Sequence, residues 1–167
     1  LKDDKIKMNF LVKDLVFSKK GFKLLALHVK STSRSNKTNR VIPFKKIQTI
    51  TSCKLIISSE NDILLPHQIP EIEDAYNNPI KMIGFHIYNY EGCLVGVIKD
   101  IIIQKSTGKI IAFIISEGMY DDLVDGYSLL PIIHYVDIHD DRIIVGDIEL
   151  KSILSQKGGL KKFLGIE

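Results

Sequence analysis

The sequence is poor in the residues that build disulfide frameworks and zinc sites. Its 167 residues contain two cysteines, Cys53 and Cys93, and no tryptophan. Two cysteines at unrelated positions are too few for the disulfide framework of a small secreted domain or for a metal-binding knuckle. We therefore expect two ordinary thiols in a reducing cytoplasm.

Long hydrophobic runs and catalytic motifs are absent as well. No apolar run approaches the roughly 20 residues that a membrane-spanning helix needs, and no signal peptide pattern is present. There is no Gly-x-Ser-x-Gly motif and no phosphate-binding glycine loop. The segment 92–96 contains two glycines but lies in an expected hairpin turn and strand, so it is no dinucleotide fingerprint. We expect a cytoplasmic, non-catalytic protein with no cofactor and no membrane span.

Charge is distributed unevenly along the chain. Residues 1–65 contain 14 Lys and Arg against 5 Asp and Glu, a net charge of +9. Residues 66–150 contain 5 against 14, a net charge of −9. Such asymmetry produces opposed surface fields. It fits two halves that dock or form a homo-oligomer, and it also fits RNA or the ribosome as an anionic partner of the first half.

The most informative pattern is an internal repeat, in which residues 10–58 and 96–146 share one order of apolar runs and turns. The matching segments are Val12-Lys13-Asp14 with Ile98-Lys99-Asp100, Lys23–Leu27 with Lys109–Phe113, Val41-Ile42-Pro43 with Leu129-Leu130-Pro131, and Lys54–Ile57 with Arg142–Val145. A repeat of this length indicates one small β module used twice. Modules this small bury a limited core, so we expect the halves to support each other.

Short apolar runs between polar turns predict the strands of both modules. The expected strands are 10–17, 23–30, 48–51 and 54–58 in the first module, and 82–89, 95–103, 110–116, 135–139 and 142–145 in the second. Gly108 supplies the positive φ of the turn between two of them. Continuous apolar runs predict strands covered on both faces, as in a small closed barrel. A proline near the first turn and acidic residues predict a short helix over 70–76.

These patterns predict a mostly β protein made of two tandem small β-barrels with short helical connectors. The first module covers residues 1–65, with a truncated first strand, and the second covers 81–150. Residues 66–80 form the linker between them. Residues 151–167 form a short C-terminal helix or tail.

Two polar loops before the matching prolines are the candidate partner-binding sites. The basic group is Arg34, Lys37 and Arg40, with Lys45 and Lys46 following after the proline, and the other loop offers Tyr120, Asp121, Asp122 and Asp125. The acidic loop does not follow the EF-hand pattern. Two positions at which that pattern needs an oxygen ligand are occupied here by Leu123 and Ile132. The basic loop contains no aromatic residue for stacking on bases. Solvated loops are the simpler interpretation of both.

Histidines of the second repeat show no metal-ligand spacing. His86 lies on the expected first strand, and His134 and His139 flank the expected fifth strand. No pair has the helical His-x-x-x-His arrangement of a zinc site. We therefore expect no metal site.

The second repeat resembles the PRC-barrel family. The resemblance is carried by Met82-Ile83-Gly84, Gly92, Val95–Asp100, Thr107–Ile110, Gly118, Leu130-Pro131 and Arg142–Val145. This module is similar to the cytoplasmic domain of the photosynthetic reaction centre H subunit and to the C-terminal domain of a ribosomal small-subunit maturation factor. Two tandem copies resemble stand-alone PRC-barrel proteins of spore-forming bacteria. Family members often have an acid before the Thr-Gly turn, where this chain has Gln104 and Ser18.

The resemblance implies a protein-interaction or adaptor module whose partner is unknown, and it supplies no catalytic residue. The alternative is an RNA- or ribosome-associated maturation factor that uses the basic N-terminal half.

Overall fold

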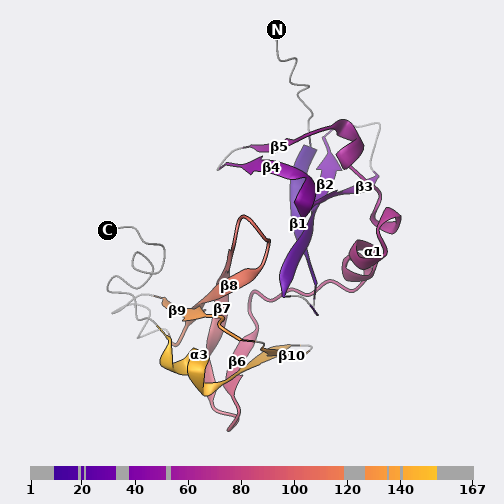
Figure 1. Cartoon of the computed structure of the whole chain (residues 1–167). Coiled ribbons are helices and arrows are strands. Elements are labelled where there is room, and N and C mark those ends of the chain that lie inside the picture. Colours follow the sequence, from indigo (N-terminus) through magenta and orange to yellow (C-terminus); the bar gives the residue numbers. More distant parts are fainter. Residues whose placement is uncertain are drawn as a thin grey trace. The chain divides into compact units, whose positions relative to one another are not determined.

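A computed structural model describes residues 10–18, 20, 22–32, 38–51, 54–118, 127–134, 136–139 and 141–153. The chain divides into two compact units (Figure 1). Unit 1 consists of residues 1–20 and 24–79, and unit 2 consists of residues 21–23 and 80–167. The protein is mostly β, as predicted. The predicted limits of the modules and of the linker stay predictions.

Unit 1 contains a three-stranded sheet and a separate two-stranded ribbon. The sheet has the order β1 (Phe10–Ser18), β2 (Lys23–Ser31), β3 (Asn39–Pro43). The ribbon pairs β4 (Ile47–Ile50) with β5 (Leu55–Ile57) in antiparallel orientation. Among the described residues, β1 therefore forms one edge of its sheet. On the other edge, the N–H of Val41 donates to the carbonyl of Leu64 at 2.8 Å.

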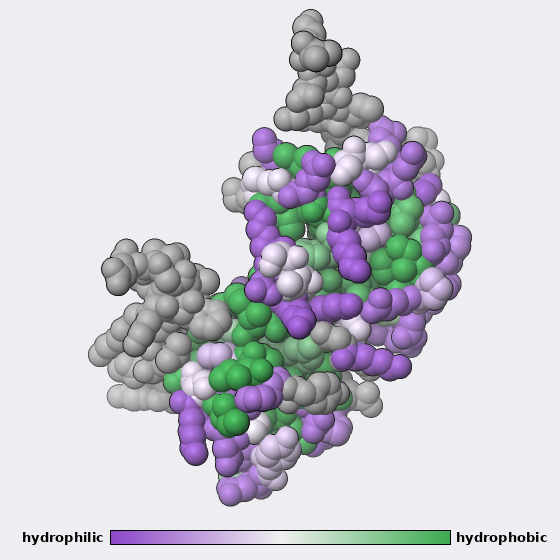
Figure 2. Space-filling view, in the orientation of Figure 1, coloured by the Kyte–Doolittle hydropathy of each residue, from purple (hydrophilic) through white to green (hydrophobic). Residues whose placement is uncertain are grey.

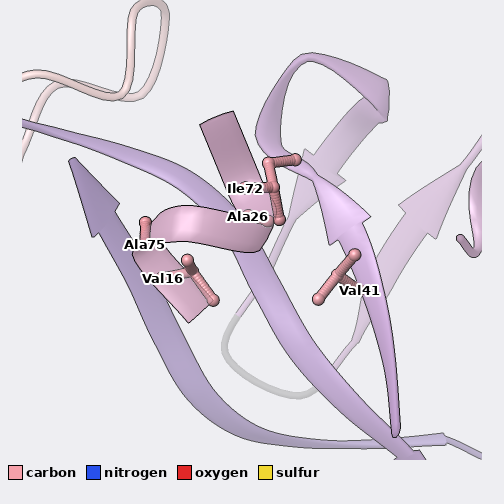
Figure 3. Packing of buried hydrophobic residues seen from close by; sticks show 5 residues of the cluster. All are labelled: Val16, Ala26, Val41, Ile72 and Ala75. Atoms are coloured by element: carbon pink, nitrogen blue, oxygen red, sulfur yellow. The ribbon is translucent and has the colours of Figure 1, made fainter. Parts of the chain in front are cut away.

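Helix α1 (Pro70–Asn77) covers one face of the β1–β3 sheet and completes the core of unit 1. It begins where predicted, because proline fits the first helical position and Glu71 and Glu73 interact favourably with the helix dipole. Figure 3 shows its side chains over the sheet. The core cluster consists of Val16, Ala26 and Val41 from the three strands and Ile72 and Ala75 from α1. Three short 3₁₀ helices, η1 (Phe44–Lys46), η2 (Glu60–Asp62) and η3 (Pro66–Gln68), precede α1.

Unit 2 contains one six-stranded sheet. Its order is β10 (Asp137–Ile138), β11 (Arg142–Val145), β6 (His86–Asn89), β7 (Leu94–Ile103), β8 (Ile110–Ser116), β9 (Ser128–Pro131). Strand β6 is parallel to β11 and antiparallel to β7. It therefore joins the β10–β11 hairpin to the β7–β8–β9 meander. Helix α3 (Asp147–Lys151) follows β11.

Pairs of adjacent buried residues mark the core of unit 2. Ala112 and Phe113 are both inaccessible to solvent, and Leu129 and Leu130 are similarly buried. Because neighbouring strand residues point to opposite faces, both faces of the sheet are covered at these positions. That is the burial that the continuous apolar runs predicted. The described residues nevertheless form these open sheets and no closed barrel.

Several predicted elements lie close to those of the structure. The turn between β7 and β8 has Gly108 at φ 75°, and its N–H donates to the carbonyl of Gln104 at 2.8 Å. The predicted strand 82–89 is shorter, because Ile83 and Gly84 form a turn, although Gly84 and Phe85 still form backbone hydrogen bonds with Ile98. The predicted truncated strand and the C-terminal tail beyond residue 153 lie outside the described residues. In the part of the chain that is described, no helix has the length and hydropathy to cross a membrane.

Candidate functional site

The carboxylate of Glu149 connects α3 to the segment after β9. Glu149 is only 3% exposed although it lies in a helix of five residues. Its Oε1 accepts a hydrogen bond from the backbone N–H of His134 at 3.0 Å and lies 3.3 Å from Nδ1 of the same histidine. A buried carboxylate is costly unless it is hydrogen-bonded, so these contacts make its burial possible.

The same contacts determine how Glu149 titrates. Burial of the carboxylate acts to raise the pKa of Glu149. Hydrogen bonds from its own backbone and from His134, with the charge of the His134 ring, act in the opposite direction, and the net pKa lies below its ordinary value. Glu149 is therefore ionised at neutral pH and holds the chain around His134 against α3.

Three large exposed apolar side chains lie near this anchored carboxylate in the chain or across Gly146: Ile133 precedes His134, Ile148 precedes Glu149, and Tyr90 is beside Gly146. Tyr90 follows β6 and is 69% exposed, while Ile133 and Ile148 are 54% and 53% exposed. A Cβ at Gly146 would lie 3.5 Å from Cε2 of Tyr90 and 3.2 Å from Oε2 of Glu149. The tyrosine ring and the carboxylate therefore flank one glycine. We call Tyr90, Ile133, His134 and Ile148 the α3 surface.

The α3 surface combines exposed apolar area with a fixed polar group. Figure 2 shows hydrophobic side chains gathered on the visible face of unit 2, over β7–β9 and beside α3. Exposed apolar residues that gather in this way mark interaction sites on soluble proteins. The His134 side chain is 59% exposed, so its ring can contact a partner while Glu149 fixes its position. Such an arrangement suits the binding of another macromolecule.

The structure describes three of the five predicted basic residues, on the consecutive elements β3 and η1. Arg40 lies on β3 opposite Val29, on a face where Val29 is 1% exposed, and is itself half-buried. Lys45 and Lys46 lie on η1 and are exposed, and Nζ of Lys46 is 3.2 Å from Oδ1 of the buried Asp62. One of the predicted partner-binding lysines thus forms an ion pair within unit 1. The remaining two basic residues of that group, Arg34 and Lys37, lie outside the described residues.

The predicted acidic loop is not part of the described chain. Tyr120, Asp121, Asp122 and Asp125 all fall within 119–126, so the prediction that they bind a partner stays a prediction. The first described residue after the loop is Tyr127, which is 43% exposed and precedes β9.

The three predicted histidines lie on different segments of unit 2. His86 is on β6, where its ring stacks with that of Tyr88 at a centroid distance of 6.3 Å, and His139 follows β10. Within the described ranges, no three His, Cys, Asp or Glu side chains form a group that could hold a metal ion. His134 is the one with a role that sequence reasoning missed, because its partner Glu149 is 15 residues away.

Sequence reasoning also missed Glu149 and the apolar residues around it. A glycine followed by acidic residues at a helix start, as in Gly146 to Glu149, is the local signal that could have indicated α3. No local signal indicates that Tyr90 lies beside Gly146, since the two are brought together by the pairing of β6 with β11.

The comparison with protein families matches this part of the chain. The model of the PRC-barrel domain matches residues 81–151. Residues 81–151 form a PRC-barrel domain. The search of curated proteins found no match. The PRC-barrel domain includes β6 to β11 and ends at Lys151, the last residue of α3, so the whole α3 surface belongs to it.

Proposed function

We propose that the protein is a cytoplasmic, non-catalytic adaptor whose PRC-barrel domain binds a protein partner through the α3 surface. The single observation that carries this proposal is the exposure of Tyr90, Ile133 and Ile148 beside the hydrogen-bonded pair of His134 and the buried Glu149. Aromatic and aliphatic residues of this kind form the centres of protein interfaces. A rigid surface also loses little conformational entropy when a partner binds.

Unit 1 is, in this proposal, a second PRC-type module. The matching segments of the repeat make the same local contact in both units. The N–H of Leu15 donates to Oδ1 of Asp14 at 2.8 Å, and the N–H of Ile101 donates to Oδ1 of Asp100 at 2.7 Å. An adaptor with two modules can engage two sites at once, which raises its overall affinity for a partner that presents both.

The adaptor function is tested by site-specific crosslinking. A photo-reactive phenylalanine analogue replaces Tyr90 in the full-length chain in its native cytoplasm, and crosslinked proteins are identified by mass spectrometry. We expect one partner, whose affinity for the purified chain falls about tenfold or more on Ile148→Asp, as for a central interface residue. Ile83→Asp is the matched control, because Ile83 is also 54% exposed but lies outside the α3 surface. Equal binding by both variants overturns the proposal.

RNA binding by unit 1 is the second candidate function, and the net charge of +9 over residues 1–65 favours it. Contacts with phosphates release counterions, so affinity for a ribosomal RNA fragment should fall steeply as salt is raised. Neutralising Arg34, Lys37 and Arg40 together should weaken binding in the same assay. Binding that is absent, or that does not change with salt, contradicts this function.

Self-association is a third candidate for the use of the opposite charges. Complementary fields on +9 and −9 segments attract two copies at low ionic strength. Sedimentation velocity at low and high salt measures it directly. A monomer under both conditions contradicts it.

A further inference from the structure

We propose that unit 1 binds an extended acidic peptide by strand addition along β1, in the position that β6 occupies in unit 2. The inference rests on the proposed correspondence of the two units but does not involve the α3 surface. It can therefore be tested separately from the proposed binding of a partner by the PRC-barrel domain.

The two units differ at one strand position. In unit 2, β6 pairs with β7 on one side and with β11 on the other. The matching strands of unit 1 are β1 and β5, and no strand of the described part of the chain lies between them. The three-stranded sheet ends at β1, while β5 belongs to a separate ribbon. In the part of unit 1 that the structure describes, β1 and β5 are thus present without a strand between them.

Exposure of apolar residues on β1 follows from this difference. Val12 is 51% exposed, whereas the matching Ile98 on β7 is completely buried. Leu11 is 53% exposed, whereas the matching Val97 is half-buried. An edge strand with exposed apolar residues is a ready template for pairing with another chain.

Strand β5, which matches the other neighbour of β6, shows the same difference in exposure. Leu55 and Ile57 are both partly exposed. The matching residues of β11, Ile143 and Val145, are completely buried. A strand added beside β5 would pair with it as β6 pairs with β11 in unit 2, and it would reduce the exposure of these two side chains.

The strand that matches β1 in unit 2 shows how the added strand would be held. In unit 2, the N–H of Ile98 donates to the carbonyl of Phe85 at 2.9 Å, and its carbonyl accepts from the N–H of Gly84 at 2.8 Å. The Lys-Asp pair that follows has the same side chain to backbone contact in both units, at Asp14 and at Asp100. This shared contact supports the match of Val12 with Ile98, on which the proposed direction of strand addition rests.

Strand β6 shows which side chains the added strand needs. Ile87 is completely buried, while the residues on either side of it are more exposed. The bound peptide accordingly places a branched aliphatic side chain at its centre. Acidic residues at its ends complement the net charge of +9 in residues 1–65, where Lys13 on β1 and Lys54 before β5 are exposed. Backbone hydrogen bonds then supply affinity, and the packing of the central aliphatic side chain supplies specificity.

A synthetic peptide with the sequence of residues 85–89, Phe-His-Ile-Tyr-Asn, and two aspartates at each end tests the proposal. It is titrated into the full-length protein, with its affinity measured by fluorescence anisotropy and its position by amide chemical shifts. We expect saturable binding with the largest shifts at Leu11 and Val12. Val12→Lys should lower affinity about tenfold or more, because lysine on an edge strand opposes pairing. Leu94→Lys is the matched control and should bind like the unchanged protein, since Leu94 is 57% exposed in unit 2.

Three outcomes overturn the proposal. The first is that the synthetic peptide does not bind the full-length protein, even if the cause is another segment that covers β1. The second is equal binding by a peptide with proline in place of its central isoleucine, since proline removes a backbone donor and a strand requires it. The third is equal binding by the Val12→Lys variant. The Ile148→Asp variant should bind the peptide normally, which separates this result from failure of the α3 surface.

Discussion

Units 1 and 2 follow the same order of strands, but one short strand makes their sheets different. With β6, the meander and the terminal hairpin of unit 2 belong to one six-stranded sheet. In the described part of unit 1, the matching strands form a sheet of three and a ribbon of two. A strand of four residues thus decides whether matching positions in the repeat belong to the core or to the surface.

The two units also complete their cores in different ways. Unit 1 uses α1, whose Ile72 and Ala75 pack on the sheet. In unit 2, Ile87 on β6 and Ile143 on β11 are both completely buried and are paired in register. Buried apolar area stabilises by about 25 cal/mol per Å² wherever it comes from. A helix and an added strand are therefore two solutions to the same shortage of core in small modules.

Replacing the central residue of β7 should have the largest effect on this comparison. Ile98→Ala removes a completely buried side chain, so we expect unit 2 to lose about 2–5 kcal/mol of unfolding free energy. Val12→Ala, the matching change in unit 1, should stay within about 0.5 kcal/mol, because Val12 is exposed. Hydrogen exchange read separately for amides of each unit measures both. Similar losses in the two units would show that Val12 is covered in solution.

A side chain at Gly96 should have the next largest effect. A Cβ at this position would lie 2.8 Å from the carbonyl oxygen of Ser116, which is backbone and cannot move aside cheaply. Gly96→Ala should therefore destabilise unit 2 by about 1–3 kcal/mol. The matching position of unit 1 is occupied by Phe10, and Phe10→Leu should cost less than about 1 kcal/mol. Urea unfolding followed by unit-specific amide signals gives both values, and a neutral Gly96→Ala contradicts the close approach of the two strands.

Much of this fold could be predicted because its signals are local. The turn at Gly108 and the start of α1 at Pro70 depend on residues within a few positions of each other. The order of the strands was predictable from the repeat. The joining role of β6 was not, since it depends on parallel pairing with β11, which lies far along the chain. Apolar runs indicate that strands exist, but they do not indicate which strands pair across long separations.

The candidate site was harder to predict than the fold. Sequence reasoning favoured charged loops, and of these the structure describes only Arg40, Lys45 and Lys46. The α3 surface depends on tertiary contacts, since Glu149 becomes buried only when the segment at His134 packs against it. Its apolar residues come from three separate places in the sequence. A run of charge is visible in one segment, whereas a surface assembled from distant residues is not.

Both units contain a buried acid with a basic side chain beside it, and Glu149 should be the more important one. Its pKa is depressed, so its contribution to stability is complete above the ordinary glutamate pKa of about 4.3 and is lost as pH falls through the lower value. Glu149→Ala leaves the N–H of His134 without its acceptor and should cost about 1–3 kcal/mol at neutral pH.

The profile of amide exchange at His134 against pH measures this contribution, and Glu149→Gln is the matched control. The glutamine can still accept the hydrogen bond but does not titrate, so the loss of protection at acid pH should disappear. His134→Gln is recorded beside it, because the histidine ring is the titratable group in contact with the carboxylate. An unchanged acid transition in Glu149→Gln would assign it to another group.

The buried acid of unit 1, Asp62, should show the smallest effect when its basic partner is removed. Asp62 is 7% exposed and accepts a local hydrogen bond from the N–H of Ser59 at 3.1 Å, with Lys46 as its ion-pair partner. Because the Lys46 side chain is 56% exposed, Lys46→Ala should lower the unfolding free energy of unit 1 by less than about 1 kcal/mol. Lys45→Ala, on the same 3₁₀ helix, is the matched control in thermal unfolding at low and high salt. If Lys46→Ala instead lowers the unfolding free energy by well over about 1 kcal/mol, the ion pair holds η1 to η2 and Lys46 is unavailable to a partner.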